Sequence, residues 1–205
     1  MKIVVAATAE QKKGFVIDEK SEAEIIWVSK SKDLSAHTGA DAYVDMLFDL
    51  MEKNDLESLL SKTVIINSVG HLLSETNSDF VRINGWPGFL QGSMVEAAGA
   101  ERHRADAERV MQELGKKMTW LPDLPGFVAP RVVCMIINEA YLALEEGVST
   151  KAEIDTAMKL GTAYPFGPFE WAEKIGIKKV AGLLQRLALE DKRYQPAPLL
   201  LKDTG

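Results

Sequence analysis

The sequence lacks several features that mark particular classes of protein. It contains one cysteine, Cys134, inside an apolar stretch, so no internal disulfide can form and the thiol is expected to be buried in a reducing compartment. Its longest apolar run, residues 132–137, is far shorter than the ~20 residues that cross a bilayer. The first residues carry one lysine and no long apolar stretch, unlike a secretory signal peptide. These absences predict a cytoplasmic protein without a membrane partner.

Basic residues and histidines are also scarce. The chain has 24 lysines and arginines against 30 acidic residues, a net charge of −6. Binding to a nucleic-acid backbone depends on clustered cations that release counterions, so no nucleic-acid partner is expected. The three histidines, His37, His71 and His103, lack the spacing of metal ligands, so no metal site is expected.

The first half of the chain alternates short apolar runs with polar stretches. The runs occupy residues 2–6, 23–28, 42–46 and 63–66, and each is apolar without alternation. Such runs are typical of parallel strands buried on both faces. Helical spacing is expected over 44–60 and 102–116. The pattern predicts an α/β layer of about five mostly parallel strands.

The second half has helical spacing. Apolar residues recur every three or four positions from Pro130 to Glu146, over most of the helix circumference. A capping box from Thr150 to Glu153 opens a further helix that ends near Gly161. Shorter helices are expected over 169–174 and 178–191, and the tail from Gln195 is expected to be irregular. We therefore expect an α/β domain at 1–122 and an all-α domain at 123–205.

Five blocks of the second half resemble, in order and spacing, the C-terminal domain of the 3-hydroxyacyl-CoA dehydrogenase family. The blocks are 123–131 (DLPGFVAPR), 138–140 (NEA), 144–148 (LEEGV), 154–161 (IDTAMKLG) and 164–170 (YPFGPFE). The resemblance implies a Rossmann-like NAD-binding domain followed by a helical dimerisation domain, and hence a homodimer. It also implies oxidation of the 3-hydroxyl of an acyl-CoA in fatty-acid metabolism. In that family a histidine takes the hydroxyl proton, a glutamate orients the histidine, and a serine and an asparagine hold the substrate.

The expected dinucleotide loop departs from the family pattern. A Rossmann fold needs glycines after its first strand so that the backbone can approach the pyrophosphate. Before residue 70 this chain has only Gly14 and Gly39, and Glu10 places a negative charge in the loop. The first half is therefore interpreted as an abbreviated Rossmann-like layer that binds NAD weakly or not at all.

The resemblance also locates the expected active-site positions. Residues 94–98 resemble the family's glutamate block, which makes Glu96 the orienting glutamate, and the histidine position twelve residues earlier holds Asn84. Ser68 matches the substrate serine, whereas Pro130 stands where the family has its asparagine. The side-chain amide of Asn84 cannot accept a proton near neutral pH.

Several alternatives stay open for individual residues. His71 is a candidate for a relocated base oriented by Glu96, or is simply a loop histidine. Glu96 is either a hydrogen-bonded carboxylate in a cleft or a solvated residue at a strand end. Gly85, Gly88 and Gly92 fit no known phosphate loop, and the apolar residues among them indicate a packed turn.

Three functions compete at this point. The first is a pseudoenzyme of the family that binds acyl-CoA without catalysis. The second is an active NAD-dependent 3-hydroxyacyl-CoA oxidoreductase with an atypical cofactor site, or with a site completed by a partner chain. The third is a structural or assembly subunit that pairs through its helical domain.

Overall fold

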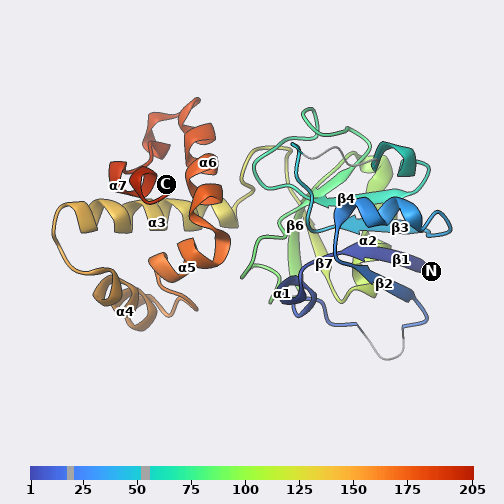
Figure 1. Ribbon diagram of the computed structural model, residues 1–205, viewed down its shortest axis with the longest axis horizontal. Helices are drawn as coiled ribbons and strands as arrows, with labels where there is room; N and C mark the ends of the chain where they lie inside the picture. Colours follow the sequence, from blue (N-terminus) through green and yellow to red (C-terminus); the bar gives the residue numbers. More distant parts are fainter. Residues whose placement is uncertain (18–20, 52–55) are drawn as a thin grey trace. The chain divides into compact units, whose positions relative to one another are not determined.

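The computed structural model describes residues 1–17, 21–51 and 56–205. The chain divides into two compact units, Met1–Phe127 and Val128–Gly205, and each is described here by itself. Figure 1 follows the chain through both units. Among the described residues, no helix has the length and apolar character needed to cross a membrane.

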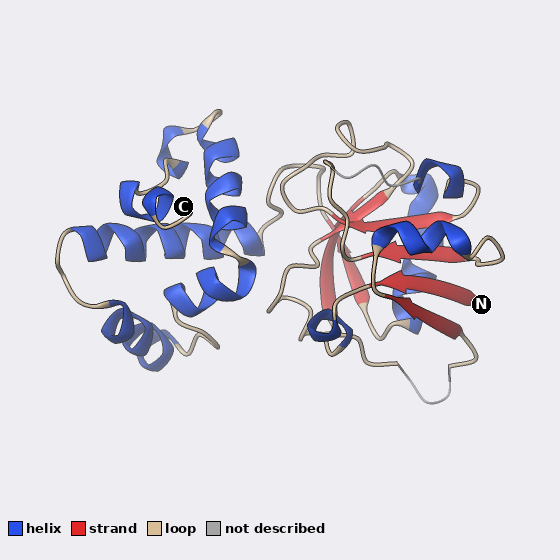
Figure 2. Cartoon of the chain, viewed as in Figure 1, coloured by secondary structure: helices blue, strands red, loops and turns tan. Residues whose placement is uncertain are grey.

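The N-terminal unit is built on a seven-stranded sheet in the order β2-β1-β3-β4-β5-β6-β7. Figure 2 draws the strands of this unit in red. Neighbouring strands are parallel except for β5 and β6, which run antiparallel. The fold is therefore the expected Rossmann-like α/β layer. The strands are β1 (Lys2–Ala6), β2 (Glu24–Val28), β3 (Ala42–Asp45), β4 (Thr63–Asn67), β5 (Val81–Ile83), β6 (Met94–Ala98) and β7 (Lys117–Trp120).

The sheet has more strands than the expected five. The four runs named from the sequence form β1 to β4, whereas β5, β6 and β7 carry no comparable apolar run. β5 has only three residues and an arginine at its centre, and β7 is a half-exposed strand at the edge of the sheet. Pairing with neighbours, rather than a run of apolar residues, defines these strands.

Both faces of the sheet are covered. On one face, Ile3 and Val5 of β1 pack with Val110 and Met111 of the helix α2 (Glu101–Glu113). On the other face, Val4 packs with Leu34 from the 3₁₀ helix η1 (Ser31–Ala36) and with further apolar residues. This double burial explains why the first strands read as continuous apolar runs.

The expected helix over 44–60 is wrong. Residues up to Asp45 belong to β3, and the next regular element is a short 3₁₀ helix, η2 (Leu56–Leu59); residues 52–55 lie outside the described part of the chain. The buried carboxylate of Asp45 accepts hydrogen bonds from Ser31 Oγ (2.7 Å) and Leu47 N (3.0 Å). Leu56 and Leu59 enter the core from η2, so the apolar spacing over 44–60 does not mark one continuous α-helix.

The C-terminal unit is helical, as expected. Its long helix α3 (Ala129–Glu145) contacts α5, α6 and α7. The capping box of α4 is confirmed, with Thr150 N and Glu153 Oε2 3.1 Å apart. The remaining elements are α4 (Lys151–Thr162), α5 (Pro168–Ile175), α6 (Ile177–Ala188), η3 (Lys192–Tyr194) and α7 (Pro198–Lys202).

The expectation of an irregular tail from Gln195 is wrong, because α7 forms there. The buried Asn138 of α3 donates to Gln195 O (3.0 Å) and accepts from Ala197 N (2.7 Å). Pro198 occupies the first turn of α7, where its missing N–H costs little, and Leu200 is completely buried. A long-range anchor thus orders a tail whose local sequence gives no helical periodicity.

Candidate functional site

The carboxyl ends of the parallel strands are the natural place to look for a site. In open α/β sheets, ligands bind beyond these ends where the strand order reverses. Here the order reverses between β1 and β3, since β2 lies on one side of β1 and β3 on the other. The segments that follow β1, β3, β4 and β5 therefore define the candidate site.

In the segment after β1, polar side chains form hydrogen bonds to the backbone of the same segment. It forms a four-residue helix, α1 (Ala9–Lys12), closed by a capping box between Thr8 and Gln11. Thr8 Oγ1 accepts from Gln11 N (3.1 Å), and Gln11 Oε1 accepts from Thr8 N (3.0 Å). The backbone amides that a glycine loop would present to a pyrophosphate are here partly occupied by side chains of the same turn.

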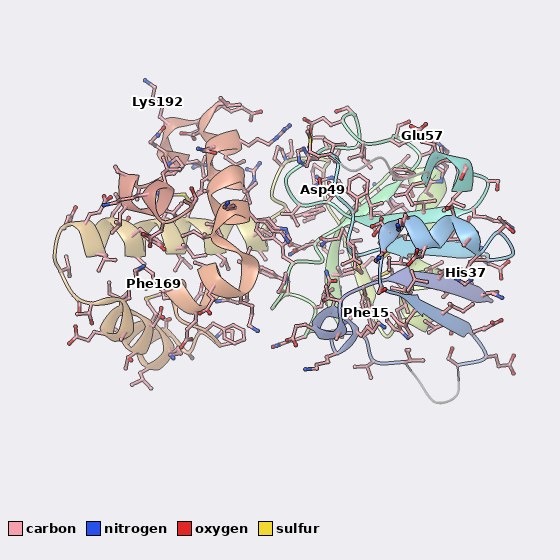
Figure 3. All side chains as sticks on the ribbon, viewed as in Figure 1. Phe15, His37, Asp49, Glu57, Phe169 and Lys192 are labelled. Atoms are coloured by element: carbon pink, nitrogen blue, oxygen red, sulfur yellow. The ribbon has the colours of Figure 1, made fainter. Side chains whose placement is uncertain are left out.

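Gln11 also bridges the point where the strand order reverses. Its Nε2 donates to the carbonyl oxygen of Met46, just after β3, at 2.9 Å. Nearby, a Cβ placed on Gly14 would lie only 2.6 Å from Leu90 Cβ, so this glycine serves close packing of the chain on itself. Phe15 follows in the buried core, and its position beside α1 is labelled in Figure 3.

One cavity at this point measures about 140 Å³ and is lined by residues 10, 11, 13 and 14 and by residues 87, 88, 90 and 91, whereas ligand pockets usually measure ~300–1,000 Å³. Because the Thr8–Gln11 capping box also occupies backbone amides after β1, these residues do not fit NAD in the way a Rossmann glycine loop does.

Residues 85–92 form the packed turn that the sequence indicated. Trp86 and Leu90 are buried. Lys116 stabilises the turn, because its Nζ donates to the carbonyl oxygens of Leu90 and Gly92, both at 2.6 Å. Burial lowers the pKa of Lys116 by penalising its charged form.

The antiparallel pairing of β5 and β6 brings Asn84 and Glu96 together. Asn84 N donates to Glu96 O (2.9 Å), and Asn84 Nδ2 donates to Glu96 Oε2 (3.0 Å). Asn84 is only 3% exposed, and its Oδ1 accepts from Trp86 N at 3.4 Å. The orientation of the amide follows from these contacts, since only its NH₂ can donate to a carboxylate.

Asn67 links this pair to the middle of the sheet. Its Nδ2 donates to Met46 O (3.1 Å), and its Oδ1 accepts from Gly85 N (2.8 Å). Gln11 and Asn67 share Met46 O as acceptor, and Asn67 also accepts from Gly85 N, which follows Asn84 in the chain. We call Gln11, Asn67 and Asn84 the amide network. The roles of Gln11 and Asn67 were not predicted, although an amide side chain at or soon after the end of a strand is a signal for a position at this edge of the sheet.

Ser68 is buried at the end of β4, and its hydroxyl donates to the backbone carbonyl of His71 at 3.0 Å. The imidazole of His71 is exposed, and the contact uses its backbone rather than its ring. Glu96 contacts Asn84, which stands at the position that the resemblance gives to the catalytic histidine. The role of His71 as a relocated base stays a prediction without a supporting contact.

Pro130 belongs to the helical unit, where it is buried in the first turn of α3. The neighbouring Arg131 places its guanidinium 6.0 Å from the ring of Tyr194. Proline has no side-chain donor or acceptor, so Pro130 offers no side-chain hydrogen bond to a substrate.

Other reactive groups do not add to the site. Burial raises the pKa of the Cys134 thiol to about 12, which disfavours the thiolate at neutral pH. His103 lies 3.4 Å from Asp79, and hydrogen bonds from Arg102 and His103 hold the pKa of Asp79 below its usual value. Within the described ranges, no three His, Cys, Asp or Glu side chains are grouped to hold a metal ion.

Comparison with known proteins agrees with the fold and the resemblance. The family described as "3-hydroxyacyl-CoA dehydrogenase, C-terminal domain" matches residues 126–203. A probable 3-hydroxybutyryl-CoA dehydrogenase of Deinococcus radiodurans is 30% identical over 191 residues, covering 83% of this chain and 68% of the relative. The chain belongs to the 3-hydroxyacyl-CoA dehydrogenase family.

Other members match over different lengths. The 3-hydroxyadipyl-CoA dehydrogenase of Escherichia coli is 38% identical over 54% of this chain and 25% of its own length. Two further curated relatives are matched over 33% and 37% of their lengths, so the chain aligns with well under half of these proteins. The crystal structure of (S)-3-hydroxybutyryl-CoA dehydrogenase from Ralstonia eutropha superposes with a TM-score of 0.68 at 20% identity, over 98% of this chain and 92% of that one. That likeness establishes a shared fold.

Proposed function

We propose that this chain is a non-catalytic member of the 3-hydroxyacyl-CoA dehydrogenase family with an acyl-CoA-binding or assembly role in acyl-CoA metabolism. One observation carries the proposal. At the position where the family has its catalytic histidine, the side chain of Asn84 donates to the carboxylate of Glu96 at 3.0 Å. Glu96 therefore still has a hydrogen-bonded partner at this position, but the partner is an amide instead of an imidazole.

The replacement matters because the two side chains handle protons differently. A neutral imidazole accepts a proton on one nitrogen while it donates from the other, whereas an amide only exchanges hydrogen bonds near neutral pH. Loss of a general base typically lowers the rate by ~10²–10⁴-fold. Pro130 removes a second family group, the substrate asparagine, from the same reaction.

The cofactor side of the site supports the same conclusion. NAD is the cofactor expected of the family, but the segment after β1 closes its own amides through the Thr8–Gln11 capping box. Gln11 then bonds to Met46 O across the point where the strand order reverses. We therefore propose that NAD binds weakly or not at all.

Ser68 and Glu96 match the family's substrate serine and orienting glutamate. Because these two residues are present, we propose acyl-CoA as the ligand. We also propose a homodimer through the helical unit, because apolar side chains of α3 and α4 are exposed. Val132 on α3 is 49% exposed, and Leu160 on α4 is 83% exposed.

The proposal is tested with the purified full chain, NADH and acetoacetyl-CoA, with an active family member assayed in parallel. We expect no NADH oxidation above the blank, a weak or undetectable heat of NADH binding, and measurable heat on adding acetoacetyl-CoA. Turnover close to that of the active relative would contradict the proposal and favour the active oxidoreductase. In that case His71→Ala would show whether His71 is the base.

A further inference from the structure

The strongest unexplained feature of the N-terminal unit is a completely buried arginine. Arg82 lies at the centre of β5, two residues before Asn84, and its side chain is 0% exposed. Its guanidinium donates to Ser68 O (3.0 Å) through Nη1 and to Leu124 O (2.6 Å) through Nη2. Nε pairs with the carboxylate of Asp123.

Two of these partners lie in a short segment, residues 123–127, that ends the N-terminal unit. Asp123 Oδ2 also accepts from Leu73 N (3.0 Å), and Gly126 N donates to Val69 O (2.8 Å). These hydrogen bonds join the segment to the loop that begins at Ser68. We call this loop, residues 68–73, the serine loop. Arg82 touches the serine loop and residues 123–127 with the same planar group.

The backbone of this segment shows why it needs such support. Gly126 has φ +83° and Phe127 has φ +47°, so two consecutive residues are in the left-handed region. For a non-glycine residue such as Phe127 this conformation is uncommon, and it persists only where the surroundings impose it. The guanidinium of Arg82 lies over the Phe127 ring, 4.2 Å from its centroid. A cation over an aromatic face stabilises that placement.

The geometry points to Arg82 as a positioning residue that joins the serine loop to the segment leading into the helical unit. One planar guanidinium serves two carbonyls, a carboxylate and an aromatic face, and a lysine ammonium cannot reproduce that fork. When Arg82 is changed, the serine loop and residues 123–127 loosen together. The consequence for acyl-CoA binding at Ser68 rests on the proposed function.

The experiment measures amide hydrogen exchange in Arg82→Lys. Two reporter amides are Leu73 N, bonded to Asp123, and Gly126 N, bonded to Val69. We expect exchange to quicken at both, by roughly ten- to a hundredfold, as for loss of one hydrogen bond to a charged group. Leu121 N, which donates to Ala97 O of β6 at 2.8 Å, should keep its rate.

A second variant covers the case in which Arg82→Lys does not fold. Asp123 is 31% exposed, so Asp123→Asn is a milder change that removes the charge facing Arg82. It should quicken exchange at Gly126. Asp79→Asn, which breaks an exposed carboxylate–arginine pair with Arg102, is the matched control and should leave Gly126 unchanged.

The outcomes separate the two proposals. Unchanged exchange at Gly126 in the folded variants, or an equal rise at Leu121, would overturn the role of Arg82. Calorimetry then adds acetoacetyl-CoA, and we expect a Kd at least about tenfold higher in Arg82→Lys than in the unchanged chain. If the unchanged chain binds no acetoacetyl-CoA, the proposed ligand is wrong, and the exchange data still decide the role of Arg82.

Discussion

At the scale of single residues, the side chain at position 84 determines what the contact with Glu96 can do. Asn84 reaches Glu96 through a backbone bond and a side-chain bond, so the geometry of the pair is fixed twice. The amide oxygen of Asn84 also accepts a hydrogen bond from Trp86 N, which fixes the orientation of the amide group. An amide does not take up a proton near neutral pH, so this side chain can hold the turn but cannot act as a general base.

Replacing Asn84 with aspartate tests whether this contact depends on charge. In Asn84→Asp, a second carboxylate would face Glu96, and the pKa of the new group would rise above its usual value of ~3.9. The folded state would then hold more protons than the unfolded state, so stability should fall as pH rises through that interval. We expect the free energy of unfolding at neutral pH to drop by ~1–3 kcal/mol, with a smaller loss near pH 4.

Urea unfolding at several pH values measures this effect. The matched control is Asn77→Asp, since Asn77 Oδ1 only accepts from Asp79 N in a partly exposed turn, and a carboxylate can still accept there. A loss in Asn84→Asp that is the same at acidic and neutral pH would show that repulsion is not the cause.

At the scale of elements, the sequence predicts well where local pattern and burial coincide. The runs that form β1 to β4 are predictable because apolar side chains pack on both faces of the sheet, although β2 at the edge is only half-buried, and α3 is predictable because apolar residues recur along it. Strand β5 could not be predicted in this way, because its three residues centre on Arg82, whose partners lie up to 42 residues away. Helix α7 depends similarly on Asn138, 59 residues before Ala197.

The candidate site also combines contacts that the sequence predicts with contacts that it does not predict. The contact between Asn84 and Glu96 could be predicted from their spacing once the resemblance was found. The amide network could not, because Gln11 and Asn67 meet at Met46 O only after β1, β3 and β4 are aligned. Long-range pairing, and not local propensity, creates those contacts.

The start of α5 provides a prediction for acid stability in the helical unit. Glu170 pairs with Lys159 and accepts from Gly167 N (2.9 Å), and these contacts hold its pKa below 4.5. A lowered pKa means that the stabilisation is present above ~4.5 and is lost as pH falls through the pKa of the folded state. In Glu170→Gln the melting temperature should be lower at neutral pH, and the difference should shrink in acid.

Thermal unfolding followed by circular dichroism between pH 7 and about pH 3 measures this dependence. Glu190→Gln serves as the control, because Glu190 is exposed just after α6. A deficit in Glu170→Gln that stays constant with pH would indicate lost packing rather than lost charge.

At the scale of the whole molecule, the helical unit leaves apolar surface uncovered. Along α3, Val132, Met135 and Ile136 line a groove of about 480 Å³ that Tyr194 also borders. In α4, Asp155 is the buried residue, whereas Ile154 and Met158 are half-buried and Leu160 is exposed. Apolar side chains grouped on the surface of a folded unit are typical of an interaction site.

We propose that a second copy of the chain occupies this groove, because the charges along it are self-complementary. Arg131 and Glu139 both line it, and they lie eight residues apart on α3, or about 12 Å along the helix. Antiparallel packing of two α3 helices would place each arginine opposite the other copy's glutamate, the self-complementarity that a two-fold interface requires. Each fully buried Val-sized or Leu-sized side chain would contribute ~1.5–3 kcal/mol toward the entropy lost on association.

We therefore expect the chain to form a dimer, and we expect one charged substitution on α3 to dissociate it. Light scattering at micromolar concentration should give a mass about twice the 22.6 kDa of one chain. Val132→Asp should shift this mass toward that of the monomer, because burying an unpaired carboxylate in an apolar interface is costly. Val148→Asp, the same change at an exposed valine just beyond α3, should leave the mass unchanged. A mass near 22.6 kDa for the unchanged chain would refute the dimer, and a dimer that survives Val132→Asp would place the interface elsewhere.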